Sequence, residues 1–231
     1  MPDFIRFDQR GYPMVSVREG YSAWLPTYED TVQDEMDWAL LRRVTSVDWP
    51  SIARAADLGC GTGRTGAWLH EHGVSGLSGV DLTPEMLERA RERDVFDSLE
   101  VADVRESGLP AQSFDLVTCC LVDEHLENLE ALYREARRLL RTGGRIVLVS
   151  YHPFFMMHAG MSTHFDHPER GPVAMPTHIH MPSDHVAAGL ACGMTLAEHH
   201  ERLIDDAWIE TKPKWKSHRD WPISACWVWR A

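Results

Sequence analysis

The chain has 231 residues, 44% of them hydrophobic, which allows one hydrophobic core without requiring a second domain. Its formal net charge of −12 makes a surface that repels phosphate backbones, so charge argues against a nucleic acid partner. The N-terminus lacks the apolar segment of a signal peptide, no later run is long enough to span a bilayer, and the five cysteines have no framework spacing, so we expect a cytoplasmic protein with reduced thiols.

The predicted elements begin with a helix and continue as an alternation of strands and helices. Residues 28–44 have apolar side chains at helical spacing (Met36, Leu40, Leu41 and Val44) and predict an N-terminal helix. Strand-like runs follow at 53–58, 77–82, 98–103, 114–122 and 145–151, and helical patterns at 64–71, 83–93 and 126–140. Thr83 is expected to cap the second of these helices, and Gly143 and Gly144 are expected to stop the third.

This alternation predicts parallel strands with right-handed crossovers, in an α/β sandwich covered by helices on both faces. The end of the chain departs from the pattern. A helix at 182–194 precedes two strands, at 195–205 and 223–231, joined by a long loop rich in Pro and Trp. Two consecutive strands predict an antiparallel pair at the sheet edge. Residues 151–182 lack periodicity, and their aromatic and Met content predicts a functional loop.

The stretch AADLGCGTGRTGAWL, residues 55–69, fits two kinds of cofactor site. From Gly61 it matches the dinucleotide fingerprint G-x-G-x-x-G, and from Asp57 it is an acid and a hydrophobic residue followed by glycines at 59, 61 and 63. A carboxylate two residues before the glycine turn would repel a pyrophosphate. It would attract the ammonium and sulfonium groups of S-adenosylmethionine, so Asp57 favours the second cofactor. The glycines let the backbone approach it closely.

Four more motifs follow in order, at residues 81–87, 102–104, 113–126 and 139–150. Together with residues 57–63 they resemble the successive motifs of class I S-adenosylmethionine-dependent methyltransferases of the small-molecule type. The resemblance covers residues 12–231 and implies a Rossmann-like three-layer sandwich, with a seven-stranded, mostly parallel sheet whose last strand is antiparallel. It also implies a helical lid or cap segment at 1–50 and a methyltransferase domain at 51–231, with a substrate-pocket loop at about 151–182.

The resemblance assigns cofactor contacts by position. Asp81 is placed to accept the ribose hydroxyls, and Asp103 and the backbone of Val104 are placed to bind adenine. Tyr21, Trp24 and Tyr28 are candidates for a lid, and packing of the N-terminal helix explains these aromatics equally well. The expected cofactor-binding residues are Tyr21, Asp57, Gly59, Cys60, Gly61, Gly63, Asp81, Leu82, Met86, Asp103, Val104 and Leu121.

The acceptor pocket is expected beyond the carboxyl ends of the strands. The expected substrate-binding residues are Trp24, Tyr28, His125, Phe154, Phe155, His158, His164 and His178. An imidazole titrates near neutral pH and can accept a hydroxyl proton. His152 is therefore the first choice for a catalytic base and His180 the second. For His125, a role beside the cofactor or behind a catalytic group is as well supported as a catalytic one.

Metal binding is the weaker explanation of the many histidines. His164, Asp166 and His167, or His178 and His180, could supply ligands to a divalent ion, but neither set has a strong signature. We therefore expect no metal.

The expected function is transfer of a methyl group to a small-molecule acceptor, in the first place a hydroxyl of a natural product or other metabolite. Enzymes that methylate the exocyclic amines of nucleobases or the amide of glutamine resemble one another in an Asp/Asn-Pro-Pro-aromatic tetrad at the end of the fourth strand. This chain has CCLV there, at residues 119–122, and the difference argues against those reactions. One alternative is a cyclisation or rearrangement by a cofactor-binding enzyme of the same fold. Another is a partner subunit that activates a second methyltransferase. We expect a monomer or homodimer with neither nucleic acid nor membrane as partner.

Overall fold

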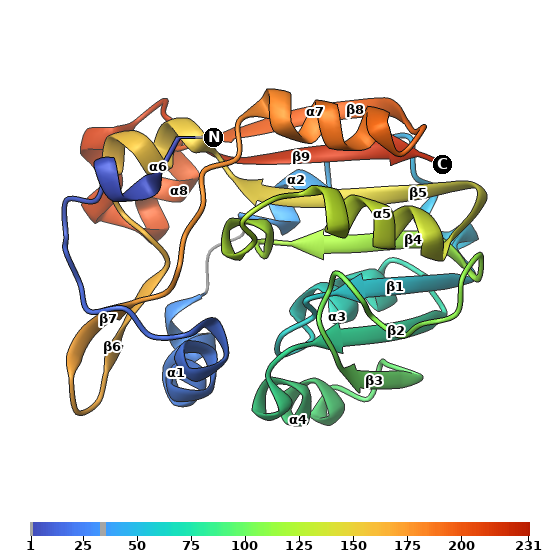
Figure 1. Cartoon of the computed structure of the whole chain (residues 1–231), viewed down its shortest axis with the longest axis horizontal. Helices are drawn as coiled ribbons and strands as arrows, with labels where there is room; N and C mark the ends of the chain where they lie inside the picture. Colours follow the sequence, from blue (N-terminus) through green and yellow to red (C-terminus); the bar gives the residue numbers. More distant parts are fainter. Residues whose placement is uncertain (1, 33–35) are drawn as a thin grey trace.

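A seven-stranded sheet with the order β3-β2-β1-β4-β5-β9-β8 forms the centre of the computed structural model, which describes residues 2–32 and 36–231 (Figure 1). The first five strands are parallel neighbours, whereas β9 runs antiparallel to both β5 and β8. The predicted α/β sheet with an antiparallel last strand is confirmed. Its strands are β1 Arg54–Leu58, β2 Gly76–Asp81, β3 Ser98–Val101, β4 Phe114–Cys120, β5 Leu140–Tyr151, β8 Thr195–Leu203 and β9 Pro222–Arg230.

Buried side chains of the central strands alternate between two clusters, one on each face of the sheet. In β5, Ile146 and Leu148 belong to the cluster that α5 and α7 cover, whereas Val147 and Val149 belong to the cluster that α2 and α3 cover. This period of two follows from the pleat. The helices are α1 Val17–Thr31, α2 Trp38–Leu41, α3 Arg64–Glu71, α4 Pro84–Glu92, α5 Glu130–Leu139, α6 Pro153–Ala159, α7 Pro182–Ala191 and α8 Asp206–Thr211.

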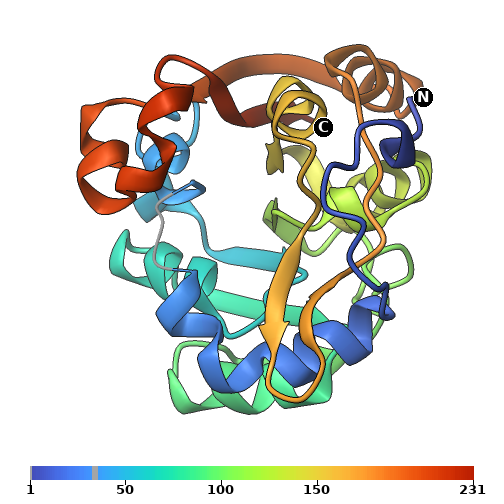
Figure 2. The ribbon, with the colours of Figure 1, turned by 90° about the vertical axis from the view of Figure 1, so that its left-hand side faces the viewer.

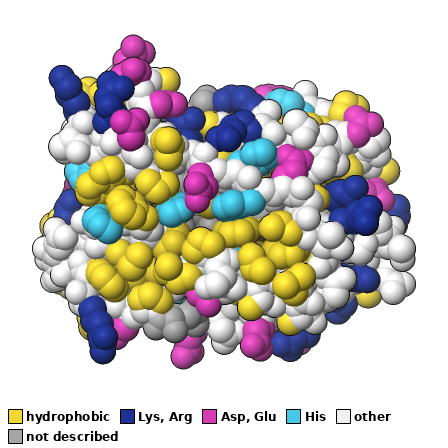
Figure 3. Space-filling view, turned by 90° about the horizontal axis from the view of Figure 1, so that it is seen from above, with side chains coloured by type: hydrophobic (Ala, Val, Ile, Leu, Met, Phe, Trp, Pro, Cys, Tyr) yellow, Lys and Arg dark blue, Asp and Glu magenta, His cyan; other side chains and the backbone are white. Residues whose placement is uncertain are grey.

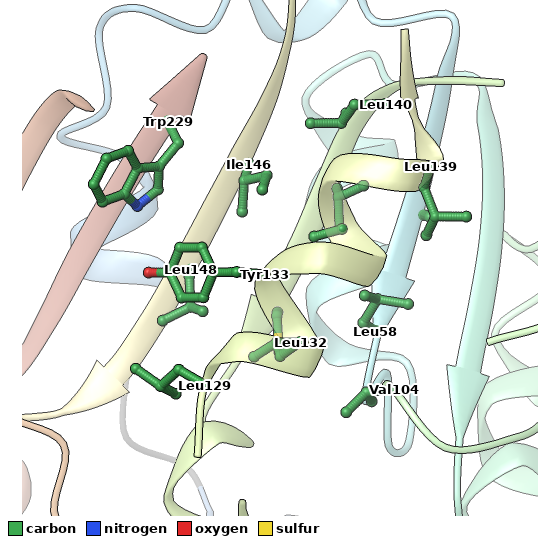
Figure 4. Packing of buried hydrophobic residues seen from close by; sticks show 14 of the residues in the cluster. Leu58, Val104, Leu129, Leu132, Tyr133, Leu139, Leu140, Ile146, Leu148 and Trp229 are labelled. Carbon is green, nitrogen blue, oxygen red and sulfur yellow. The ribbon is translucent and has the colours of Figure 1, made fainter. Parts of the chain in front are cut away.

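The amphipathic helix α5 packs its apolar side against the sheet, where the ring of Tyr133 lies over Leu148 and Leu132 belongs to the same buried cluster (Figure 4). The ring of Tyr133 meets that of Trp229 edge to face, with 6.0 Å between the ring centroids. The Tyr133 hydroxyl lies 3.0 Å from Nδ1 of His185 in α7, which ties the two helices together. Full burial of each large apolar side chain contributes about 2 kcal/mol, so this layer holds the strand ends in place.

The predicted N-terminal helix over 28–44 is wrong in its bounds. Helix α1 begins at Val17, and α2 is a separate turn of four residues. The Ser16 hydroxyl accepts a hydrogen bond from the backbone N–H of Glu19, 3.3 Å away, and so caps α1. The sequence Ser-x-x-Glu is a capping-box pattern that the periodicity argument overlooked. Residues 33–35 of the predicted helix lie outside the described residues.

Three other expectations are corrected. Helix α5 ends at Leu139 and β5 starts at Leu140, so Gly143 and Gly144 lie within the strand, beside a register shift in its pairing with β4. The expected loop at 151–182 contains α6 and a hairpin of β6 His164–His167 and β7 Gly171–Ala174. The loop between the last two strands contains α8 and a 3₁₀ helix at Pro213–His218.

These additional elements gather over the carboxyl ends of the parallel strands, where α1 crosses beside the β6–β7 hairpin (Figure 2). The N-terminal segment is bonded to that hairpin, because Val15 N–H donates to the carbonyl of Ala174 and Ala174 N–H to that of Pro13, both at 2.9 Å. The chain thereby places a second layer opposite the strand ends, and side chains of both layers enclose space between them.

The face over α7 and β8, seen from above in Figure 3, carries apolar patches and a row of histidines. Exposed apolar side chains here include Leu190 of α7 and Leu196 and Leu203 of β8, the edge strand. Within residues 2–32 and 36–231, no helix combines the length and the apolarity needed to cross a membrane.

Candidate active site

Two cavities meet at the carboxyl ends of the strands. The glycine-turn cavity, about 270 Å³, is lined by the turn after β1, the ends of β2 and β4, and α1. The aromatic cavity, about 550 Å³, is lined by α1, α6, β6, α8 and the segments beside them. The two cavities adjoin each other, because five of the described residues line both: Trp24, Val32, Leu121, Tyr151 and Thr163.

The turn after β1 is folded tightly against the neighbouring strands. The backbone N–H groups of Gly59 and Cys60 donate to the carbonyl of Val80 at 2.7 and 2.9 Å. Gly59 has φ +74°, and a Cβ there would lie 2.4 Å from a methyl carbon of Val122, so only glycine fits. Gly61 lines the cavity with φ +53°, and a Cβ on it would meet no protein atom within 4 Å. The turn therefore presents bare backbone to the cavity.

Asp81 stands at the end of β2 and lines the same cavity. Its carboxylate accepts hydrogen bonds from the backbone N–H groups of Gly61 and Thr83, at 2.9 and 2.8 Å. Burial raises the pKa of Asp81, and these hydrogen bonds oppose that shift. The carboxylate is thus fixed between the glycine turn and the start of α4, on the wall of the cavity.

Asp57 was expected to contact the cofactor. It lies behind the glycine turn, however, and does not line the cavity. Its side chain is 1% exposed, and Oδ1 accepts a hydrogen bond from the Thr118 hydroxyl at 2.7 Å. Among the described residues, Oδ2 has no hydrogen-bond partner. Burial raises the pKa of Asp57 to about 7, and the charges of Asp37 and Asp81 add to the shift. A cation nearby would relieve this carboxylate.

Asp103 follows β3 and lines the cavity with Val104, but its carboxylate is already paired. Nε and Nη2 of Arg105 donate to its two oxygens at 2.8 and 2.6 Å. These hydrogen bonds hold the pKa of Asp103 below its usual value. An adenine amine would share the carboxylate with Arg105 or displace it, and the sequence reasoning did not foresee this arginine.

Tyr21 and His125 form a hydrogen-bonded pair on the wall of the glycine-turn cavity. The Tyr21 hydroxyl lies 3.0 Å from Nε2 of His125, and Nδ1 of His125 lies 2.9 Å from the carbonyl oxygen of Pro176. A carbonyl only accepts, so Nδ1 carries a proton and, in the neutral imidazole, Nε2 accepts the Tyr21 hydrogen. Burial raises the pKa of Tyr21 well above its usual value, which keeps the phenol protonated.

Glu124 lines the cavity next to this pair and is 2% exposed. Its Oε1 accepts from the Thr163 hydroxyl at 3.3 Å and lies 3.9 Å from Nε2 of His125. Its Oε2 has no hydrogen-bond partner within the described part of the chain. Sequence reasoning missed Glu124 and Thr163, although the position of Glu124 beside His125 after the fourth strand was a usable signal.

His152 and His180, the two histidines expected to act as bases, line neither cavity. Nδ1 of His152 accepts from the backbone N–H of Phe154 and caps α6, and Nε2 lies 3.1 Å from a carboxylate oxygen of Glu201 in β8. Nε2 of His180 donates to the carbonyls of Asp123 and Leu126, at 3.0 and 2.9 Å. Burial lowers the pKa of both imidazoles. The geometry argues for structural roles and against either histidine as the base.

The structure brings most of the expected cofactor-binding residues to the glycine-turn cavity. Besides Asp57, Gly63 is the exception: it begins α3 with φ +81°, and a Cβ there would lie 2.9 Å from the Phe96 ring. Those that line the cavity are Tyr21, Gly59, Cys60, Gly61, Asp81, Leu82, Met86, Asp103, Val104 and Leu121.

Five of the eight expected substrate-binding residues line one or both cavities, and three line neither. Tyr28 and His125 line the glycine-turn cavity, Phe155 and His164 line the aromatic cavity, and Trp24 lines both. The three that line neither are Phe154, His158 and His178. Phe154 stacks on His158, with 4.0 Å between ring centroids, and the backbone N–H of His178 donates to the carbonyl of Glu124. Residues that sequence reasoning missed include Arg10, Tyr12, Tyr151, Trp208, Lys212, Lys214 and Trp215.

The candidate metal ligands do not come together. In the part of the chain that the structure describes, no three His, Cys, Asp or Glu side chains are grouped so as to hold an ion.

Comparison with known proteins supports the interpretation of the glycine turn. Residues 56–148 match the family described as "Methyltransferase domain". A ubiquinone biosynthesis O-methyltransferase of Xanthomonas oryzae pv. oryzae is 35% identical over 102 residues, which are 42% of this chain and 42% of the relative. The chain thus matches less than half the length of that relative.

Solved structures resemble the chain over more of its length. An S-adenosylmethionine-dependent methyltransferase from Mesorhizobium loti is 25% identical with a TM-score of 0.68, and the match covers 85% of this chain and 98% of that one. The [4+2]-cyclase SpnF has the same fold, with a TM-score of 0.65 at 15% identity and coverage of 96% and 98%.

The fold is that of the class I S-adenosylmethionine-dependent methyltransferases, as the sequence motifs predicted. Within it, residues 56–148 are a methyltransferase domain, and the cofactor of the class is S-adenosylmethionine. The residues present fit this cofactor, because bare backbone at Gly61 and the carboxyl group of Asp81 border the cavity, and Oδ2 of Asp57, buried behind the turn, lacks a hydrogen-bond partner among the described residues.

Proposed function

We propose that the protein methylates a hydroxyl group of a small molecule. Bound S-adenosylmethionine supplies an activated methyl group on a sulfonium, so the protein has to align the acceptor and remove its proton. The observation that carries the proposal is that two cavities adjoin: one is bordered by the glycine turn and Asp81, and the other is lined in large part by aromatic side chains.

The glycine-turn cavity is the proposed cofactor site. Gly61 offers close approach of the backbone, and Asp81 offers a carboxylate for ribose hydroxyls. Asp57 lies behind the glycine turn rather than on the cavity wall, and its role in this proposal is to lose its proton and act at longer range when a cationic ligand binds. Residues 1–50 are the proposed lid, because Tyr21, Trp24 and Tyr28 of α1 line this cavity, and residues 51–231 are the proposed methyltransferase domain.

The Tyr21–His125 pair is the proposed proton acceptor. When an acceptor hydroxyl donates to the phenol oxygen of Tyr21, the Tyr21 proton can pass to Nε2 of His125 along their 3.0 Å hydrogen bond. The acceptor proton then resides on Tyr21 and the former tyrosine proton on His125, while the acceptor oxygen is free to form its bond to carbon. The Pro176 carbonyl holds the imidazole in the tautomer that this transfer requires.

Substitution of this pair tests the proposal. Turnover is measured as release of S-adenosylhomocysteine with a panel of phenols and catechols, and cofactor affinity by calorimetry with S-adenosylhomocysteine. We expect His125→Asn and Tyr21→Phe to lower kcat by about 10² to 10⁴. The affinity of His125→Asn for S-adenosylhomocysteine should stay within a few-fold of the parent's. His70→Asn, on the exposed side of α3, is the matched control. Undiminished turnover of His125→Asn would exclude this pair as the proton acceptor.

A cyclisation or rearrangement on bound cofactor is the alternative, favoured by the structural likeness to a [4+2]-cyclase. Release of S-adenosylhomocysteine in proportion to product separates the two, because a cyclisation consumes no cofactor. We further propose a natural product or other metabolite as substrate, rather than a nucleic acid, and a cytoplasmic monomer or homodimer.

A further inference from the structure

The aromatic cavity has a charge pattern that the methyl-transfer reaction does not explain. Among the residues that the structure describes, its charged lining residues are Arg10, Lys212, Lys214 and Asp166, three cations and one carboxylate. The whole chain has the opposite balance, with 23 Lys and Arg against 35 Asp and Glu. Cations are therefore gathered at this cavity against the composition of the protein.

Two of these cations lack a carboxylate partner among the described residues. The guanidinium of Arg10 donates to the Tyr12 hydroxyl at 3.0 Å and lies 3.7 Å from the sulfur of Met161, both neutral groups. The ammonium of Lys214 lies 5.6 Å from the centre of the Trp215 ring. Both side chains are exposed, so the cations keep their hydration until a ligand arrives.

None of these cations lines the glycine-turn cavity. The five residues shared by the two cavities, Trp24, Val32, Leu121, Tyr151 and Thr163, carry no charge. Arg10 and Lys214 line the aromatic cavity alone, and they come from opposite ends of the chain. A molecule that reaches from the shared residues to these two side chains is neutral at its reacting end and anionic at its far end.

Aromatic side chains form much of the wall of the aromatic cavity, together with several polar ones. Tyr12, Phe155, Phe165, Trp208 and Trp215 line it, and Trp24 stacks on Phe165 with 5.4 Å between ring centroids. Such walls suit an aromatic ring, and a guanidinium with free N–H groups suits a carboxylate.

We propose that the acceptor is a hydroxylated aromatic carboxylate, whose acid group is bound by Arg10 and Lys214. The proposal rests on the function proposed above and adds the chemical class of the substrate. Asp166, the one carboxylate among the described lining residues, contributes repulsion, and the described cations outnumber it.

Paired ligands test the proposal: hydroxycinnamic and hydroxybenzoic acids are compared with their methyl esters, which keep the ring and hydroxyl but lose the charge. Binding in the presence of S-adenosylhomocysteine is followed by quenching of tryptophan fluorescence. We expect each acid that binds to do so about tenfold more tightly than its ester, an advantage reduced by salt. Arg10→Gln and Lys214→Gln should each reduce it, and the double variant should abolish it.

Arg6→Gln and Lys216→Gln are the matched controls, because both are exposed cations near the same two segments and line neither cavity. They should leave the acid preference unchanged. If no acid binds more tightly than its ester, including the case in which neither binds, or if the double variant keeps the preference, the proposal is overturned. Calorimetry with S-adenosylhomocysteine alone distinguishes this failure from failure of the proposed function, which predicts cofactor binding in every variant.

Discussion

Asp57→Asn is expected to stabilise the protein in mild alkali while weakening cofactor binding. The pKa of Asp57 is raised from 3.8 to about 7 by burial. Between those pH values the folded state binds more protons than the unfolded state, so the free energy of unfolding falls as pH rises. The gap of about 3 pKa units corresponds to about 4 kcal/mol lost by pH 8, of which between 2 and 3 kcal/mol, roughly, is lost above pH 5.

The asparagine removes this charge but leaves an amide N–H group without an acceptor where Oδ2 now stands, at a cost of about 1–3 kcal/mol. Its oxygen can still accept from Thr118. The variant should therefore match the parent within about 1 kcal/mol at pH 5 and exceed it by about 1–3 kcal/mol at pH 8.

Urea unfolding followed by tryptophan fluorescence at the two pH values measures this difference, with the ligand-free protein. Asp48→Asn, which removes an exposed carboxylate, measures the effect of net charge alone. Calorimetry with S-adenosylhomocysteine should show weaker binding to Asp57→Asn. A stability difference between parent and variant that is the same at pH 5 and pH 8 would show that Asp57 is not held protonated by burial.

Two further predictions concern the glycine turn and His152. Gly59→Ala should lower the free energy of unfolding by at least about 1 kcal/mol more than Gly108→Ala. Both glycines have φ near +74°, but only at Gly59 would the new Cβ meet another side chain. Equal losses of unfolding free energy, measured by urea unfolding, would contradict the close packing. His152→Ala should cost about 1 kcal/mol, as loss of the α6 cap, and keep kcat within twofold. A hundredfold fall in kcat with full cofactor affinity would restore His152 as a base.

The sheet and the cofactor side could be predicted because their signals are local in sequence. Each strand ends at a motif, and Gly59, Asp81 and Asp103 follow strands whose carboxyl ends share one edge of a parallel sheet. The alternation of strands and helices fixes that edge without knowledge of side-chain packing. For the same reason the antiparallel last strand followed from two consecutive strands without a helix between them.

The acceptor side could not be predicted because its walls come from segments far apart in the chain. Arg10, Phe165 and Lys214 meet at one cavity although more than a hundred residues separate the first two. The histidines were ranked by distance from β5 along the sequence, whereas their direction depends on local caps. Nδ1 of His152 caps α6, and this bond directs Nε2 toward Glu201 of β8. Hydrophobic periodicity in the sequence does not reveal a bond of this kind.

The bonding of Val15 to Ala174 has a consequence for how ligands enter and leave. Tyr21 lies on α1, which begins two residues after Val15. The N–H of Met175, next to Ala174, donates to the carbonyl of Thr163. The segments that carry the Tyr21 phenol and the Thr163 hydroxyl are therefore joined to each other by backbone hydrogen bonds. If the proposed lid opens, both side chains are expected to move together, so that the proposed cofactor site and the proposed acceptor site would open at once.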